Sequence, residues 1–452
     1  MIYGDAKIKN RVWQGGIIMN NERRMIQTDQ GFFYMPSAFV TLKVTVEGIY
    51  DHDKMQEAVL RLEKVHPTIN NVVCKKGDEM WFEDTGKHVS LVEYDEERNI
   101  RWEDAILDMT VQPVNLLEIP GVMVGVVIRS DRFYVLMVCH HMYGDGISVK
   151  QLMDNLLYMY STGRILKTRE NIPMPTEESL PEDCKMPEAL RERLLNFHRT
   201  CKEKKVEFSW ETYKQMIDTH NATVGTGLTC RNIKGSAFRN LRGKCKEMGV
   251  TINSAIATAI AATLQKGDGM DAIVAVDTRA IFDNVGKRGI ANYASCVQPR
   301  LNYDFNIGFW ENVVKTHDKI KQERADNHKV LNTLYTFMIL NADMFGVGYH
   351  ARYGLFRDME VLMELRNTLG LTKETETFDI SNIGKVEFYA NSEDFVVRDC
   401  YFVSNPMPAC ACTFGIVTLN NLLTISLGHK QNLVSTQEAK NILEQIITWL
   451  SI

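Results

Sequence analysis

The sequence feature that most constrains this chain is an apolar run that ends in two adjacent histidines. Residues 133–152 read FYVLMVCHHMYGDGISVKQL. The run before the histidines is typical of a buried strand, and a helical repeat of apolar side chains begins close to Gly146. A second apolar run at residues 121–130 is separated from the first by a polar turn, which predicts an antiparallel hairpin inside a sheet. We therefore expect His140 and His141 at a strand–loop–helix junction.

Composition narrows the class of protein. The chain has 452 residues, of which 45% are hydrophobic and 24% charged, enough for more than one core in an ordinary globular protein. A net charge of -5 and a pI near 6.2 offer no basic field for nucleic acid or an anionic membrane, so a small or neutral ligand is favoured. Ten cysteines without a CxxC pair indicate free thiols. With no apolar leader and no membrane span in sight, we expect a cytoplasmic protein.

Strand and helix patterns alternate along the chain, with one interruption. A strand at 38–48 precedes a helix capped by Asp51 or Asp53, and an alanine-rich buried helix begins near residue 251. Residues 171–187 contain four prolines and several acidic side chains, which predicts a linker with exposed backbone. The pattern predicts two α/β lobes. The expected division is 1–170 for the first lobe, 171–205 for the linker and a connecting helix, and 206–452 for the second lobe.

The two histidines allow three interpretations. On an extended segment neighbouring side chains point to opposite faces, so only one of the pair can meet a substrate, and both can also be purely structural. Metal binding is the third interpretation. His141 and Asp145 are four residues apart, but a glycine-containing loop separates them and no third ligand is suggested nearby. No metal is therefore expected.

Several segments share the pattern of a known superfamily. HHMYGDG resembles the HHxxxDG signature of the acyltransferases that include chloramphenicol acetyltransferase, alcohol acetyltransferases, polyketide-associated acyltransferases and the condensation domains of peptide synthetases. Further resemblances follow in the order found in that superfamily. They are VEGIYDHDKMQEAVLRLEKVHPTI at 46–69, TINSAIATAIAATL at 251–264, VAVDTRAIFDNVGKRGIANYAS at 274–295 and DISNIGKV at 379–386.

The resemblance implies an α/β fold of two chloramphenicol-acetyltransferase-like lobes, with the active site in a tunnel at their interface. In that picture His141 is the general base, an assignment that suits an imidazole titrating near neutrality. His140 is structural. The resemblance also implies that Asp145 pairs with Arg279 and shapes the loop without carrying a proton.

Three further residues complete the expected site. Gly146, at the start of the helix, permits close backbone approach. Ser381 or Asn382 lies across the tunnel near the developing oxyanion, or else forms only a turn at the end of a strand.

The function that the resemblance implies is acyl transfer. An acyl-CoA or an acyl group on the phosphopantetheine of a separate carrier protein is the expected donor, a small-molecule hydroxyl or amine the acceptor, and no bound cofactor is expected. We expect a monomer. Two alternatives stay open: a non-catalytic relative that binds a carrier or another partner, and an enzyme of the same fold that hydrolyses, epimerises or cyclises a thioester.

Overall fold

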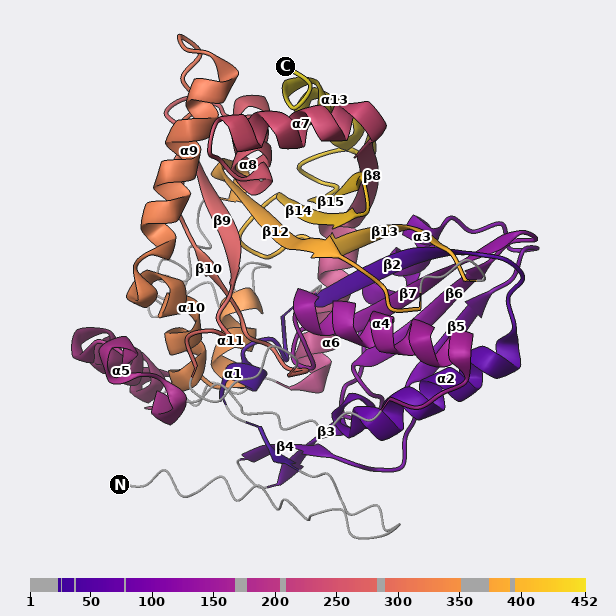
Figure 1. The fold of residues 1–452 in the computed structure, drawn as a ribbon. Helices are drawn as coiled ribbons and strands as arrows, with labels where there is room; N and C mark the ends of the chain where they lie inside the picture. Colours follow the sequence, from indigo (N-terminus) through magenta and orange to yellow (C-terminus); the bar gives the residue numbers. More distant parts are fainter. Residues whose placement is uncertain are drawn as a thin grey trace.

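The two predicted α/β lobes are present. The computed structural model describes residues 23–25, 27–35, 38–76, 79–166, 177–203, 209–282, 289–350, 374–390 and 395–452. Within these residues the chain forms two large mixed sheets and a small one, with helices packed on their faces (Figure 1). The mixed α/β fold class is therefore confirmed.

The first lobe is built on a five-stranded sheet in the order β13-β2-β7-β6-β5. Neighbouring strands are antiparallel, except that β5 and β6 run parallel. The strands span Phe39–Glu47 (β2), Ser90–Tyr94 (β5), Val122–Ile128 (β6), Arg132–His140 (β7) and Val397–Ser404 (β13). Ile128 pairs with Phe133 across the turn between β6 and β7, so the predicted hairpin is confirmed.

Helices cover both faces of this sheet. The helices are α2 (His52–Val65), α3 (Trp102–Thr110) and α4 (Gly146–Thr162). Phe133 of β7 contacts Tyr160 of α4, whereas Lys43 of β2 lies over Trp102 of α3. Because side chains alternate between the faces of a strand, α4 and its neighbour α2 cover one face and α3 the other. Asp51 is the N-cap of α2, where the sequence allowed either Asp51 or Asp53.

The second lobe is built on a larger sheet in the order β10-β9-β12-β14-β15-β8, with β11 also paired to β9. β12 runs parallel to both of its neighbours, and the other pairs are antiparallel. The strands span Thr226–Lys234 (β8), Met270–Asp277 (β9), Ala294–Val297 (β10), Arg300–Leu301 (β11), Thr377–Val386 (β12), Cys412–Leu419 (β14) and Leu422–Lys430 (β15).

Four helices pack their apolar side chains into a common core on one face of the larger sheet. They are α7 (Gly235–Glu247), α8 (Ile252–Leu264), α9 (Phe309–Arg324) and α13 (Thr436–Trp449). Thr251 caps α8 and Ser435 caps α13 through side-chain oxygens that accept backbone N–H groups. The alanine-rich helix α8 is buried along most of its length.

The remaining elements are short or connect the lobes. Three strands, β1 (Arg23–Arg24), β3 (Val72–Lys76) and β4 (Glu79–Glu83), form the small sheet. The helices are α1 (Gln27–Gln30), α5 (Glu188–Glu203), α6 (Trp210–Thr223), α10 (Asn327–Ile339) and α11 (Ala342–His350). The single-turn helices are η1 (Pro67–Asn70), η2 (Glu177–Ser179), η3 (Glu182–Cys184) and η5 (Glu374–Glu376).

One strand crosses from the second half of the chain into the first lobe. β13 lies within 206–452, yet it pairs with β2 at the edge of the first-lobe sheet (Figure 1). It also packs over the second-lobe sheet, where a Cβ on Gly415 would lie 2.2 Å from the Phe402 carbonyl oxygen. Glycine therefore lets the two sheets approach. The assignment of all residues after 205 to the second lobe is wrong for this strand.

The linker differs in part from the prediction. Residues 171–176 lie outside the described residues. The described residues 177–187 include two single-turn helices, η2 and η3. Leu180, Cys184 and Met186 are buried. The Tyr335 hydroxyl of α10 donates to the Cys184 carbonyl at 2.7 Å. The segment 177–187 is therefore exposed only in part, because these three apolar side chains anchor it between exposed residues.

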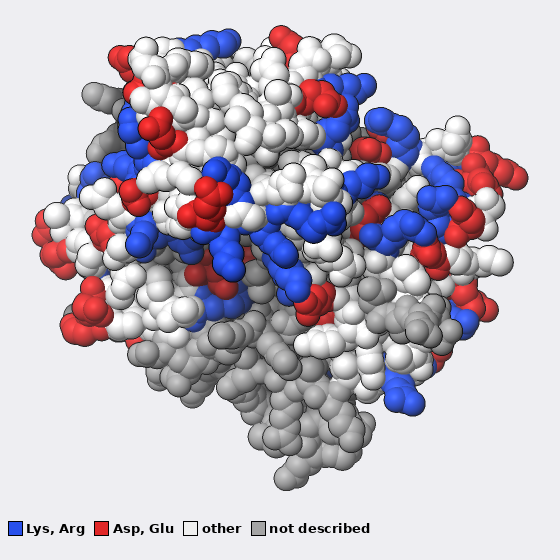
Figure 2. Space-filling view, turned by 45° about the horizontal axis from the view of Figure 1, so that its top comes forward, with Lys and Arg blue, Asp and Glu red and all other residues white. Residues whose placement is uncertain are grey.

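The surface carries charges of both signs, as the small net charge of the chain predicts. Figure 2 shows acidic and basic side chains interleaved over the face in view, with Lys and Arg frequent across its middle. The nine cysteines whose side chains are described are all free. Across the described residues no single helix is both long and apolar enough to cross a membrane, although α7 and α8 together pass that test as a pair bent by 103°.

A buried ion pair fastens β13 to β2. The Lys43 ammonium, 2% exposed, donates to Asp399 and to the Thr45 hydroxyl, each at 2.6 Å. Burial lowers the pKa of Lys43, and the Asp399 carboxylate opposes that effect. The ammonium also lies over three aromatic rings, those of Trp102, Tyr134 and Tyr401, at 5.0, 4.9 and 5.0 Å from their centroids.

Removing the carboxylate should weaken the first lobe. Asp399→Asn leaves the Lys43 ammonium without its counter-charge, so we expect the free energy of unfolding to fall by about 1 to 3 kcal/mol. The control is Arg300→Gln, which removes an exposed pair with Asp271 and should cost less than about 1 kcal/mol. Urea unfolding of both variants measures the difference. Equal losses would mean that the aromatic rings hold Lys43 without Asp399.

Candidate active site

His141 is held by the first-lobe sheet and by an aromatic ring from the N-terminal segment. Its backbone N–H donates to the Ala38 carbonyl at 2.8 Å, which continues the pairing of β7 with β2 by one residue. The imidazole stacks on the Phe32 ring with centroids 4.5 Å apart and planes at 15°. The side chain is half-buried. Stacking on Phe32 therefore restricts the orientation of the ring.

Electrostatics favour a neutral His141. Burial lowers the pKa of this imidazole, and the Asp145 carboxylate, the residue's own backbone carbonyl and the Asn292 side chain oppose that effect. Its Nδ1 atom is buried without a regular hydrogen-bond partner in the described part of the chain. A pKa below 6.5 leaves the ring uncharged at neutral pH, which is the form that accepts a proton.

His140 has different surroundings. It is 1% exposed, packs edge-on against the Phe39 ring at 5.0 Å, and accepts a hydrogen bond at Nδ1 from the Met142 N–H. Burial, with the neighbouring His141, lowers the pKa of His140 to about 3. This enclosure leaves the His140 side chain little access to solvent, and its structural role stays a prediction.

Asp145 is the N-cap of α4 and accepts three hydrogen bonds besides those from an arginine. It caps the helix by accepting the Ser148 N–H at 2.9 Å and hydroxyl at 3.0 Å, and it accepts the Tyr293 N–H at 3.0 Å. Arg279 donates to both carboxylate oxygens, at 2.7 and 3.0 Å. Burial alone would raise the pKa of Asp145, but the Arg279 guanidinium and these N–H groups hold it below 3.8.

In all, the Asp145 carboxylate accepts five hydrogen bonds, three from Ser148 and Tyr293 and two from Arg279. The three donors outside the arginine fix both carboxylate oxygens even before the ion pair is considered. A carboxylate with every oxygen engaged in this way has little capacity left to move a proton.

Arg279 links the second lobe to the histidine loop. It follows β9, is 3% exposed, and its guanidinium lies 4.6 Å from the centroid of the Tyr293 ring. Besides Asp145 it donates to the Asp277 carboxylate at 2.9 Å and to the carbonyls of Gly289 and Ala291 at 3.1 and 3.3 Å. The predicted contact between Asp145 and Arg279 is therefore present, and it joins the two lobes.

Gly146 lies where the lobes approach most closely. A Cβ at this position would be 2.6 Å from Cγ2 of Ile383 on β12 and 3.0 Å from the Phe402 ring on β13. A side chain there would push these strands away from α4, because the Phe402 neighbour is a buried, packed ring. The expected close approach at Gly146 is present.

Ser381 and Asn382 lie inside β12 and not at the end of the strand. Asn382 donates from Nδ2 to Asn253 of α8 at 3.2 Å and accepts the Gly384 N–H at 2.8 Å, so its amide is engaged within the second lobe. Ser381 pairs with Gly415, and its side chain points to the face of β12 opposite to that of Asn382. No hydrogen bond among the described residues joins either side chain to the histidine loop, and their proximity to a substrate stays a prediction.

The sequence did not single out Phe32 or Asn292 as site residues. Asn292 acts on His141 and lies one residue before Tyr293, in the Asn-Tyr segment whose resemblance was noted without a role. Phe32 lies more than 100 residues before His141, in an aromatic run that reads as ordinary core. The resemblance therefore included the segment that contains Asn292, whereas no sequence pattern indicated that the Phe32 ring stacks on His141.

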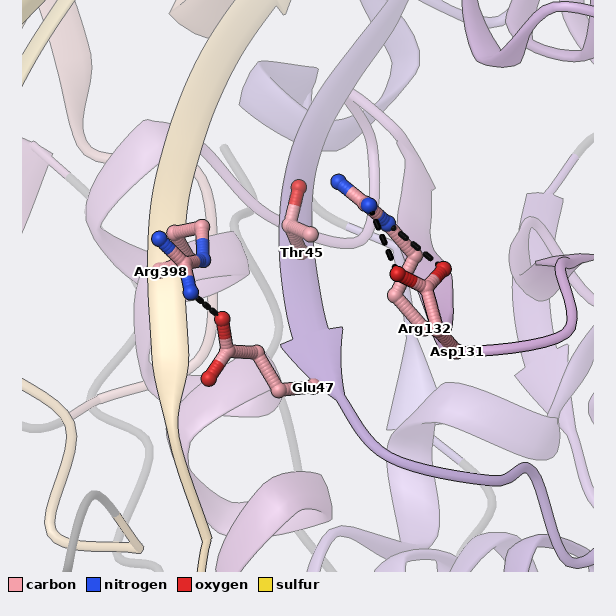
Figure 3. A pocket seen from close by; sticks show the side chains of 5 residues that line it. All are labelled: Thr45, Glu47, Asp131, Arg132 and Arg398. Atoms are coloured by element: carbon pink, nitrogen blue, oxygen red, sulfur yellow. Dashed lines mark hydrogen bonds and ion pairs between the residues drawn. The ribbon is translucent and has the colours of Figure 1, made fainter.

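A cavity of about 250 Å³ lies elsewhere in the first lobe. Thr45, Glu47, Asp131, Arg132 and Arg398 line it (Figure 3). Arg132 begins β7 and His140 ends it, so eight residues, or about 26 Å of strand, separate the cavity from the histidines. Its charged groups pair with one another, Arg398 with Glu47 and Arg132 with Asp131. We do not assign the active site to this cavity, and the tunnel stays a prediction.

No group of three His, Cys, Asp or Glu side chains in the described ranges is arranged to hold a metal ion. The site instead combines an uncharged imidazole, an ion pair between lobes and closely packed strands. Two α/β lobes joined by this ion pair are what the resemblance to the acyltransferase superfamily predicted. The chain belongs to the alcohol acetyltransferase family, whose model matches residues 103–450.

Solved structures with the same fold cover nearly the whole chain. Trichothecene 15-O-acetyltransferase from Fusarium sporotrichioides is 10% identical, with 96% of this chain and 95% of that chain covered and a TM-score of 0.64. Polyketide synthase associated protein 5 from Mycobacterium tuberculosis is 13% identical, with 95% and 96% covered and a TM-score of 0.59. The epimerization domain from the third module of tyrocidine synthetase B is 15% identical, with 98% of each chain covered and a TM-score of 0.58. A search of curated protein sequences found no match.

Proposed function

We propose that this protein transfers an acyl group from an acyl thioester, an acyl-CoA or an acyl carrier protein, to the hydroxyl or amine of a small acceptor. His141 is the general base. The observation that supports this most directly is an imidazole kept neutral by burial, on a loop that the Asp145–Arg279 pair fixes between the lobes. Membership of the alcohol acetyltransferase family supports the reaction class.

The proposed reaction needs one proton carrier. The imidazole of His141 takes the proton of the acceptor hydroxyl or amine as its oxygen or nitrogen bonds to the thioester carbonyl carbon. The tetrahedral intermediate then collapses, the carbon–sulfur bond breaks, and the imidazolium returns the proton to the departing thiolate. Asp145 takes no part in this transfer because Ser148, Tyr293 and Arg279 occupy its oxygens. Its role is to hold the loop.

The pH profile tests the proposed base. Because burial lowers the pKa of His141 below 6.5, the neutral and active form is present above that pKa and is lost as the pH falls through it. We expect kcat/KM to stay level from about pH 7 upward through the neutral range and to fall on the acid side with a single apparent pKa below 6.5. Initial rates in a series of buffers of equal ionic strength measure it. An acid limb centred well above pH 7 would contradict this role.

The reaction itself is tested with a panel of acyl-CoAs, with and without alcohols and amines, while free thiol is followed. Thiol release that requires an acceptor, with the acylated product found by mass spectrometry, is the expected result. Release without an acceptor would show hydrolysis instead. Release from acyl carrier protein alone would assign the donor to the carrier. No release from either donor would reject the proposal and favour a binding protein.

A further inference from the structure

A second polar group in the second lobe faces the first lobe. Asp379 of β12 stands opposite Thr413 of β14 and Ile273 of β9. The residues on either side of it, Phe378 and Ile380, pack into the core beneath the second-lobe helices. Ser381, on the same side of β12 as Asp379, pairs with Gly415, which lies against the Phe402 carbonyl of β13 in the first-lobe sheet. Since partners in register share a face, the Asp379 side chain points toward the first lobe.

Among the described residues, no Lys or Arg forms an ion pair with Asp379. The carboxyl is 7% exposed. Burial raises its pKa to about 7, with the Ile380 N–H and the Thr413 hydroxyl opposing. The thiols of half-buried Cys296 on β10 and buried Cys410 before β14 lie close enough for the Asp379 charge to raise their pKa. Lys430 of β15 acts on Cys410. A buried carboxyl without a counter-charge costs free energy of folding, and such groups are frequent at functional sites.

The position of Asp379 relative to the active site follows from the strand. Asp379 and Ser381 alternate onto the same side of β12, and Ile383 follows in the bulge between Asn382 and Lys385. Ile383 lies against Gly146, at the start of the helix that follows the histidine loop. Four residues at about 3.3 Å each place Asp379 about 13 Å along the strand from that contact. Ser381 lies between them, so the three residues form a row that leads away from the histidine loop.

We propose that Asp379 is a specificity residue that binds a second hydroxyl of the acceptor, remote from the hydroxyl that is acylated. The inference rests on the proposed function. A carboxyl that is about half protonated at pH 7 can both donate to and accept from a neutral hydroxyl. An ammonium would instead require the ionised carboxylate. The acceptor class is therefore a diol or polyol whose second hydroxyl extends along the row from Ser381 to Asp379.

The test uses acetyl-CoA and matched acceptors. Diols with hydroxyls at both ends, four to ten carbons long, are compared with 1-alkanols of equal length. In the parent we expect kcat/KM to favour the diol at one or two lengths. The ratio of kcat/KM for the diol to that for the alcohol should fall about tenfold in Asp379→Leu, mainly through KM of the diol. Asp379→Asn, which keeps a hydrogen-bonding amide, should lose less.

Asp271→Asn is the control, because Asp271 lies on the neighbouring strand and pairs only with exposed Arg300 among the residues described. Its ratio should match the parent. The inference is overturned if the parent shows no preference for any diol, or if Asp379→Leu and Asp379→Asn keep the parent ratio. Circular dichroism and thermal unfolding identify a variant that does not fold, and Asp379→Asn then carries the test. Absence of transfer to every alcohol, amine and diol in the parent, from acyl-CoA and from acyl carrier protein alike, would instead reject the proposed function.

Discussion

His141→Ala is expected to lower turnover by about 10²- to 10⁴-fold, because the variant loses the group that carries the proton. Folding should change little. The ring is half-buried and its main contact is the stack on Phe32, so its removal opens no large cavity in the core. Steady-state acyl transfer, followed as thiol release, measures turnover, and thermal unfolding measures the effect on stability.

His52→Ala is the matched control for His141→Ala. His52 lies at the exposed start of α2, where it interacts with Glu93, and its substitution removes an imidazole without touching the loop. Turnover of this variant should equal that of the parent. If His141→Ala keeps turnover within about tenfold of the parent, proton transfer has another carrier and His141 is not the base. Unfolding of His141→Ala at room temperature would point to a structural role.

Local patterns predicted the elements that position the histidines. Strand alternation and the polar turn identified the hairpin of β6 and β7, and the helical repeat after Gly146 identified α4. Capping chemistry is local as well, which is why a few neighbouring residues narrowed the N-cap of α2 to Asp51 or Asp53, of which Asp51 is the cap. These features depend on residues that are close in sequence, and periodicity therefore reveals them.

Contacts between distant segments had no such signal. β13 joins the first-lobe sheet by pairing with β2, which lies more than 350 residues earlier in the chain. The sequence of β13 is typical of any strand and does not identify this partner. The stack of Phe32 on His141 and the polar row from Asp379 likewise arise from tertiary packing. Only the resemblance to a superfamily predicted that Arg279 meets Asp145, since composition and spacing do not bring residues 134 apart together.

The second large effect concerns the ion pair between the lobes. Asp145 and Arg279 are 4% and 3% exposed, so removing one partner leaves a charge that water cannot solvate. We expect Arg279→Met to reduce the free energy of unfolding by about 3 to 5 kcal/mol. Asp145→Asn should cost less, because Arg279 keeps Asp277 as a second carboxylate. Denaturant unfolding of parent, both single variants and the double variant gives the four values.

The double variant should be less destabilised than the sum of the two single variants, because it removes the charge that each single substitution leaves unpaired. The pH dependence has a definite sign. The pKa of Asp145 is held below 3.8 in the folded protein, so the stability that its ionised form contributes is present at neutral pH and is lost as the pH falls through that lowered pKa. Turnover should fall together with stability in both single variants. If Asp145→Asn unfolds like the parent yet loses as much turnover as His141→Ala, the carboxylate takes part in the chemistry and its structural role has to be abandoned.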